Sequence, residues 1–374
     1  MYRLWKPAFA ALVCLLLVLA TAQAEVVEGL YRQQILVQSQ GDAERREAAS
    51  RALESVLVRV TGRTDIMQQP AASQLATRAG QLLESYRYET TTETLQQGDE
   101  QLPASRLILT FSRAAIDNTL RRAGLPIWPD NRPSVLVWLV KDDINGGRQQ
   151  VSLQEPGELT AVVAEVTASR GLPVVVPLLD LQDQLSISAD DLWRLDGEKI
   201  RAASARYGVD AIAIGRYSQT SSGRWLGAWS LLHKQRMEVF DSHSDQGEAA
   251  LVAAGLDAIG TYLGNAYAIV SSPDTRGGVL LQLQQVQSFA NYVDALDYLE
   301  SMAVVRQLEL IALRHSNLWV YLHTEGEIDA LLDALALDRR LMAPAKDPGV
   351  IALPRQSTAP LGSWENPLRF RWPG

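Results

Sequence analysis

Residues 134–140 read SVLVWLV, and residues 209–217 read VDAIAIGRY. The first is a continuous apolar run, which is typical of a strand buried on both faces of a sheet. Between the two, the sequence predicts a helix around residues 161–166 that Gly171 closes, a strand over residues 172–179 and a helix over residues 197–207. Alternating strands and helices imply right-handed crossovers and a parallel sheet. Residues 132–270 are therefore predicted to form an α/β domain.

The second half of this domain has a different pattern. Residues 209–218, 225–233 and 237–241 read as three strands of an antiparallel meander, with a turn at residues 221–224. A long helix over residues 247–270 follows. The expected central domain thus combines a partly parallel sheet with an antiparallel meander.

Residues 25–131 predict an α+β domain. A strand within residues 26–39 precedes a helix that begins at Asp42 and that Gly62 ends. A second helix is expected over residues 73–86, and then a hairpin formed by residues 88–95 and 105–112. Ser112 is a suitable N-cap for a short helix that ends near Gly124.

The last part of the chain predicts a ferredoxin-like module over residues 275–342, after a turn-rich linker at residues 271–278. The expected order is βαββα. Its strands are residues 279–286, 304–313 and 318–324, and its helices are residues 289–301 and 327–337. Residues 343–374 form a tail in which a proline-rich, extended stretch (343–367) precedes a last strand at residues 368–372. The predicted fold is thus multi-domain, α/β and α+β.

The first 24 residues predict export. Arg3 and Lys6 precede an apolar run from Pro7 to Ala20, and residues 22–24 read AQA, which is typical of a signal peptide cleaved after Ala24. The alternative is an uncleaved anchor, although the run is shorter than the ~20 residues of a membrane span. The single cysteine, Cys14, lies inside this run. The mature chain therefore has no disulfide, thiolate nucleophile or zinc–cysteine site, and its expected location is the periplasm.

Charge and motifs exclude several functions. The chain has a net charge of −8 and no basic run, so we expect no binding to nucleic acid. Beyond Ala24 no apolar stretch is long enough to cross a membrane. The common nucleotide-binding, zinc-protease and serine-hydrolase motifs do not occur. No cofactor or metal is predicted.

Charged residues follow the predicted strands of the central domain. Ligands bind beyond the carboxyl ends of parallel strands, so these residues could form one site at one edge of the sheet. The alternative is that charges occur there because strands end at solvent. The residues are Lys141, Asp142, Asp143, Asp180, Asp183 and Arg216.

Two tryptophans form the other candidate surface. Trp225, Gly227 and Trp229 are two residues apart and share one face of a strand. Tryptophan is common in binding hot spots, but core packing explains this pair as well.

Two short polar segments give weaker alternatives as metal sites. Residues 241–245 (DSHSD) resemble a metal loop, but a polar turn with Asp245 as a helix cap explains them equally well. Residues 142–147 (DDINGG) lack the ligand spacing of a calcium loop and read as a tight turn at Asn145.

Four segments resemble a proteobacterial exported family known as domain of unknown function 2066. They are residues 52–62 (ALESVLVRVTG), 135–139 (VLVWL), 170–181 (RGLPVVVPLLDL) and 206–215 (RYGVDAIAIG). Residues 172–245 also resemble the amino-terminal domain of TolB and the periplasmic lipoproteins that activate penicillin-binding proteins. That resemblance implies a docking module rather than an enzyme.

The sequence thus favours a non-catalytic interaction protein of the Gram-negative envelope, with other envelope proteins as partners. The alternative is a periplasmic hydrolase or small-ligand-binding protein that uses the acidic strand ends of the central domain.

Overall fold

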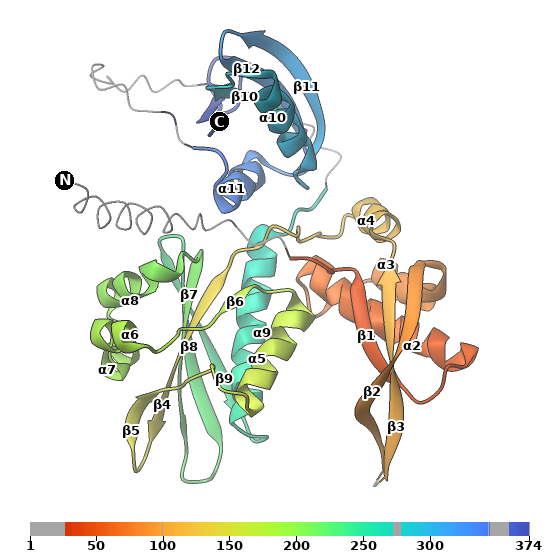
Figure 1. Ribbon diagram of the computed structural model, residues 1–374, viewed down its shortest axis with the longest axis vertical. Helices are drawn as coiled ribbons and strands as arrows, with labels where there is room; N and C mark the ends of the chain where they lie inside the picture. The colour runs from red at the N-terminus through yellow and green to blue at the C-terminus, as the bar shows by residue number, and fades with distance from the viewer. Residues whose placement is uncertain (1–26, 99, 272–277, 343, 345–358, 374) are drawn as a thin grey trace, which may run out of the picture.

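The protein is described by a computed structural model, which covers residues 27–98, 100–271, 278–342, 344 and 359–373. The expected signal peptide, most of the expected linker and most of the proline-rich tail lie outside these residues. The described chain contains three β-sheets, and helices pack against each of them. We call each sheet with its helices a unit: the N-terminal, the central and the C-terminal unit (Figure 1).

The N-terminal unit is a three-stranded antiparallel sheet in the order β1-β3-β2, with helix α2 packed on one face. Glycine in the left-handed conformation ends α2 at Gly62, as the sequence predicts. The elements are β1 (Arg32–Val37), α2 (Asp42–Thr61), η1 (Ile66–Gln68), α3 (Pro70–Thr77), η2 (Ala79–Gln81), β2 (Leu83–Gln97), β3 (Glu100–Phe111) and α4 (Arg113–Arg122).

One prediction in this unit is wrong. The helix expected over residues 73–86 begins at Pro70 and ends at Thr77, and β2 begins at Leu83. The hairpin is correspondingly longer than expected, because residues 83–87 pair with β3 instead of continuing a helix.

The central unit contains the partly parallel sheet. Strand β4 is parallel to β7, and β7, β8 and β9 form the antiparallel meander. The elements are β4 (Val135–Asp143), β5 (Gly147–Gln150), α5 (Glu158–Arg170), β6 (Val174–Val175), α6 (Leu181–Ser186), α7 (Ala189–Arg194), α8 (Gly197–Ser204), η3 (Ala205–Tyr207), β7 (Ala211–Gln219), β8 (Trp225–His233), β9 (Arg236–Ser244) and α9 (Glu248–Tyr267).

Helices cover the two faces of this sheet unequally (Figure 1). Helices α5 and α9 pack over one face, where Val137, Trp229 and Leu256 belong to one core. Helices α6 to α8 pack over the other face, where Trp138, Leu192 and Ile214 form a second core. The second core lies mainly on β4 and β7, so β9 and the adjacent part of β8 are left open on that side.

Four details of the central unit differ from the predictions. The strand expected over residues 172–179 is reduced to Val174–Val175, and the short helices α6 and α7 were not predicted. Helix α9 ends at Tyr267 rather than at residue 270. Its N-cap is Gly247, whereas Asp245 pairs with Arg224.

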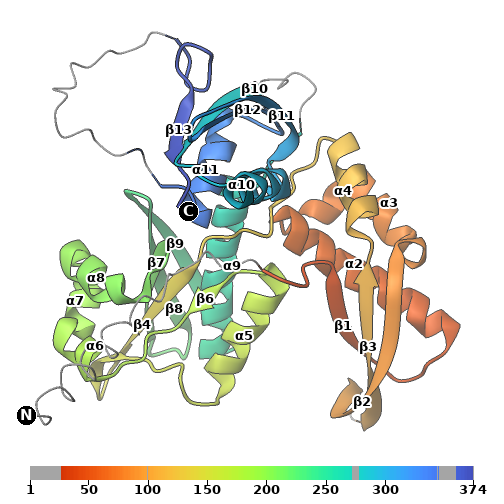
Figure 2. The same cartoon turned by 45° about the horizontal axis from the view of Figure 1, so that its top comes forward.

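The C-terminal unit has the predicted βαββα order and the strand order β11-β12-β10-β13. The last strand runs parallel to β10, while β10 and β11 are both antiparallel to β12. The elements are β10 (Gly278–Gln284), α10 (Phe289–Ser301), β11 (Val305–Arg314), β12 (Asn317–Thr324), α11 (Ile328–Asp338) and β13 (Leu368–Arg371). In both orientations this unit lies beyond the end of α9 (Figure 2).

Buried arginines join the N-terminal and central units. Arg132 has no exposed surface and donates hydrogen bonds to carbonyl oxygens of both units, including those of Arg59 and Arg170 at 2.9 and 2.7 Å. Burial lowers the pKa of Arg132 to about 9. The Arg59 guanidinium binds the carbonyls of Leu30, Arg32 and Ser169. Guanidinium–carbonyl contacts across the boundary therefore hold these two units together.

Candidate functional site

The charged residues predicted to form one strand-end site have separate partners. Lys141 pairs with Glu248 at 2.8 Å, and Asp142 lies 3.7 Å from Arg148. Asp143 accepts hydrogen bonds from the backbone N–H groups of Asn145 and Gly146, as expected for a tight turn. Each group thus has its own partner, and the groups do not converge on a common ligand position.

Asp180 and Asp183 belong to a network that fixes the start of α6. Asp180 caps α6 by accepting a hydrogen bond from the Asp183 N–H, and it binds Arg206 through both oxygens at 2.8 and 2.9 Å. The Arg206 contact and the cap lower the pKa of Asp180 to about 2. Asp183 is fully buried and accepts hydrogen bonds from Leu179 N–H, Tyr207 and Arg206. Both carboxylates are therefore committed to holding α6 against the chain around residue 206.

The two candidate tryptophans lie on the helix-covered face of β8. Trp229 is buried beneath α9, and its Nε1 donates to Ser242 Oγ at 3.0 Å. Trp225 is half-buried, packs against Tyr217 and lies beneath the Lys141 ammonium, 4.8 Å from the ring centroid. The alternative of core packing accounts for Trp229 directly.

Arg216 is the predicted site residue that faces an open groove. Its Nη1 donates to the Trp193 carbonyl at 2.8 Å, whereas its Nε is buried and has no hydrogen-bond partner among the described residues. Burial lowers the pKa of Arg216. The groove has a volume of about 570 Å³, and its lining includes Trp193, Leu226, Ala228, Asp241 and His243.

Strand register explains why these side chains meet. Arg216, Ala228 and Asp241 lie opposite one another on β7, β8 and β9, and Ser218, Leu226 and His243 form the next row. Opposite residues in adjacent antiparallel strands have Cβ atoms about 5 Å apart. The small Ala228 side chain therefore leaves a hollow between Arg216 and Asp241.

Strand β9 exposes apolar side chains beside this groove. Val239 is 61% exposed and Met237 is 42% exposed, whereas Ser242 and Ser244 on the opposite face are buried. Soluble proteins normally place the apolar side of an amphipathic strand inward. Phe240 on the covered face packs into the core, so β9 carries apolar side chains on both of its faces.

Strand β9 is also an open edge. It ends the strand order of the central sheet, and its ladder with β8 runs through nine pairs without a bulge. Proteins usually protect such edges with bulges, proline, lysine or a covering segment. The edge strand β11 of the C-terminal unit, by contrast, carries two register shifts.

Histidines provide no metal centre in the described part of the chain. His233 is buried and bonded to the Tyr267 hydroxyl at 2.7 Å, and His323 lies 2.9 Å from Glu309. His243 is exposed in the groove, and Asp241 and His243 are both on β9 rather than in a loop. No group of three or more potential ligands capable of holding a metal occurs among the residues described.

Comparisons with known proteins identify no function. A family described as a domain of unknown function (DUF8605) matches residues 24–129, which cover the N-terminal unit. This is a different family from domain of unknown function 2066, which the sequence segments quoted above resemble. No curated protein matches significantly.

Two solved structures show weak likeness. The LpoB C-terminal domain from Salmonella enterica is 12% identical with a TM-score of 0.21, and the match covers 30% of this chain and 83% of that one. Lipoprotein GNA1162 from Neisseria meningitidis is 15% identical with a TM-score of 0.22, and the match covers 36% of this chain and 98% of that one. With TM-scores this low, neither likeness bears on function.

Proposed function

We propose that this chain is a non-catalytic docking protein of the bacterial envelope, in which β9 receives an extended segment of a partner protein as an added strand. The observation that carries the proposal is the unprotected edge of β9, with Met237 and Val239 pointing outward. An extended segment added to such an edge gains main-chain hydrogen bonds, and side-chain pockets select its sequence.

The open face beside β9 indicates the chemistry of the partner. Met237 and Val239 suit apolar side chains on alternate residues of the added segment. Asp241 is exposed and forms no ion pair within the described residues, so a lysine or arginine of the partner fits beside it. Arg216 lies at the inner end of the same row.

The acidic residues do not favour a hydrolase. A general acid or base must be free to reach a substrate proton, and the Asp180 and Asp183 carboxylates are occupied by a helix cap, Tyr207 and Arg206. The pKa of Asp180 is lowered to about 2, which is opposite to the rise that a general acid needs.

The pattern of residues 1–24 supports export and a periplasmic location. None of the helices in the described ranges combines the length and the apolar character that a membrane span requires.

Photo-crosslinking in intact cells tests the proposal. A photoreactive amino acid is placed at Met237 or Val239 on β9, or at Leu313 on the bulged edge β11 as the matched control. Leu313 is 50% exposed, close to the values of the two test positions. We expect one partner segment to be captured from positions 237 and 239 and not from position 313.

A substitution on β9 tests whether the crosslink depends on the apolar side chains of this strand. Val239→Lys places a charge on the apolar stripe without touching a buried side chain, so it should abolish the crosslink from position 237 while leaving the melting temperature unchanged. The proposal is wrong if position 313 captures the same segment equally well, or if Val239→Lys leaves the crosslink undiminished.

A further inference from the structure

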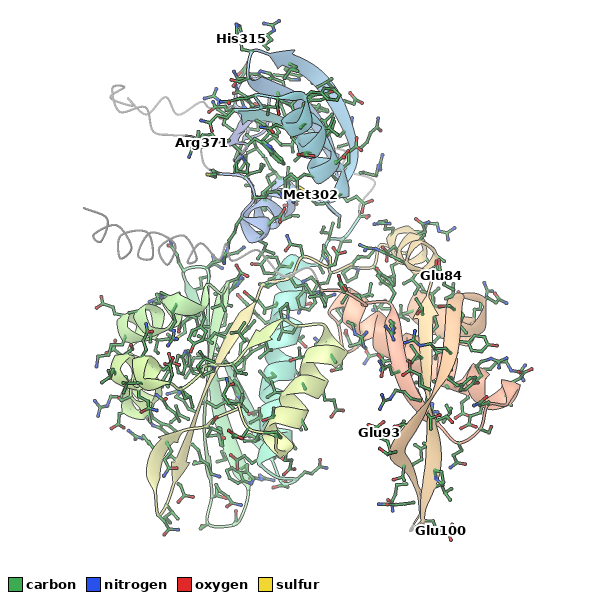
Figure 3. The ribbon with its side chains drawn as sticks, in the orientation of Figure 1. Glu84, Glu93, Glu100, Met302, His315 and Arg371 are labelled. Carbon is green, nitrogen blue, oxygen red and sulfur yellow. The ribbon has the colours of Figure 1, made fainter. Side chains whose placement is uncertain are left out.

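A second hollow lies at the junction of the central and C-terminal units. Its volume is about 500 Å³, within the range of small-molecule sites. It is bounded by the end of α9, the end of α10, helix α11 and the connecting residues 129–131. Figure 3 labels Met302, one of its lining residues, at the end of α10 that faces the central unit.

Three ion pairs span the joint between the C-terminal unit and the rest of the chain. Lys234 pairs with Asp333 at 2.8 Å, Arg121 pairs with Glu325 at 2.9 Å, and Arg339 pairs with Asp210. These pairs are at least partly exposed and leave the interior of the joint unfilled. Glu327 and Asp329 of its lining are exposed, so the hollow opens to solvent.

The charged residues that line the hollow are all acidic, while the Arg340 guanidinium lies outside the lining, over the Tyr298 ring at 5.0 Å from its centroid. No lysine, arginine or histidine occurs among the described residues that line it. Two of its acids are neutralised from outside the lining, Asp333 by Lys234 and Asp130 by Arg113. Three acids of the lining form no ion pair within the described residues: Glu327, Asp329 and Asp338.

Two buried polar atoms of the lining lack partners, and both can accept a hydrogen bond. Tyr298 is 4% exposed, and its hydroxyl makes no hydrogen bond with acceptable geometry. Burial and the neighbouring Asp338 carboxylate raise the pKa of Tyr298, so the hydroxyl stays neutral. The buried Oδ1 of Asn131 also has no partner, while its Nδ2 donates to the Ala334 carbonyl.

Together these groups define the ligand. Three carboxylates without an ion pair, one of which lies beside the Tyr298 hydroxyl, and the unpartnered Asn131 Oδ1 call for a ligand that is positively charged and rich in N–H donors. Met302, Leu337 and Ala334 supply apolar surface for an aliphatic stem. We propose that this cavity binds a linear aliphatic polyamine. The inference is independent of docking at β9, which lies on a different surface.

Titration calorimetry of the full-length mature protein with spermidine tests the inference. We expect saturable binding with one molecule per chain, and no binding of the neutral analogue 1,8-octanediol. Asp329→Asn combined with Asp338→Asn should weaken spermidine binding by about 10-fold or more, because each lost carboxylate removes a charged hydrogen-bond acceptor.

A matched variant separates the cavity from general attraction to an acidic protein. Asp294→Asn combined with Asp297→Asn makes the same charge change on exposed positions of α10 outside the lining, and it should alter affinity by less than about twofold. Tyr298→Phe should weaken binding several-fold, and thermal unfolding checks that the variant stays folded. Absence of saturable heat, or an equal loss in both double variants, would overturn the inference.

Discussion

At the scale of single residues, Asp183 shows why charged side chains near strand ends are difficult to interpret from sequence. It is fully buried and binds a backbone N–H, a tyrosine hydroxyl and Arg206. Its sequence position resembles that of an exposed strand-end acid. Only the three-dimensional contact with residues 206 and 207, more than twenty positions away, reveals its structural role.

Asp183→Asn should therefore destabilise the fold. The amide keeps the shape but loses the charge opposite Arg206 and one of its acceptor oxygens, which should reduce the free energy of unfolding by about 2–4 kcal/mol. Urea unfolding followed by tryptophan fluorescence measures the change. A stability equal to that of the wild type would show that the network contributes nothing.

Asp180 gives a pH-dependent prediction. Its pKa is lowered from 3.8 to about 2 in the folded state, so its contribution to stability is present above the unfolded pKa and is lost as the pH falls towards 2. Asp180→Asn should be less stable than the wild type at neutral pH, and the difference should shrink between about pH 4 and pH 2. Urea unfolding across this range provides the measurement, with Asp297→Asn as an exposed control. A constant difference across the range would contradict the prediction.

Buried arginines were not predicted at all. Arg59 lies in the last turn of α2, where a basic residue normally interacts with the helix dipole and solvent. Here its guanidinium binds carbonyl oxygens of β1 and the central unit. The sequence contains no nearby acid to signal this role, because the partners are backbone carbonyls.

At the scale of elements, glycines correctly predicted helix ends and an apolar run correctly predicted a buried strand, whereas the short helices could not be predicted. Gly62 and Gly171 end helices in the left-handed conformation, and the SVLVWLV run forms a fully buried strand, as predicted. Helices α6 and α7 have six residues each, too few to show a helical period. The exposure of Met237 and Val239 on β9 could not be predicted, because alternation shows that a strand has two faces but not which face a helix covers.

The packing of α9 on β8 makes a sharp prediction at Gly255. A Cβ added there would lie 2.0 Å from Trp229 Cε2. Gly255→Ala should therefore destabilise the protein by about 1–3 kcal/mol through overpacking. Helix propensity alone would give a gain of about 1 kcal/mol, so the sign of the change decides between the two effects. Thermal unfolding measures it, and an increased melting temperature would contradict this packing.

At the scale of the whole molecule, the two joints between units differ in kind. Fully buried Arg132 connects the N-terminal and central units through carbonyl oxygens on both sides. The C-terminal unit is attached mainly through partly exposed ion pairs, which typically contribute less than about 1 kcal/mol each. We therefore expect the first joint to be rigid and the second to be the weaker one.

Arg132→Met should separate the unfolding of the two joined units. Its loss leaves several carbonyls unpaired in a buried interface, at a cost of about 3 kcal/mol or more. Calorimetry should then show an additional transition, whereas Lys234→Met at the weaker joint should leave the number of transitions unchanged. A single unshifted transition in the Arg132 variant would show that the joint does not depend on this residue.

Amide hydrogen exchange on β9 measures whether a partner segment adds to this edge as a strand. A synthetic peptide with the sequence captured at position 239 is added to the purified mature protein, and exchange is measured residue by residue. We expect exchange to slow by about 10-fold or more within residues 236–244, because outward N–H groups of the edge become hydrogen-bonded, while β11 is unaffected. Unchanged exchange in β9 in the presence of bound peptide would contradict docking by strand addition.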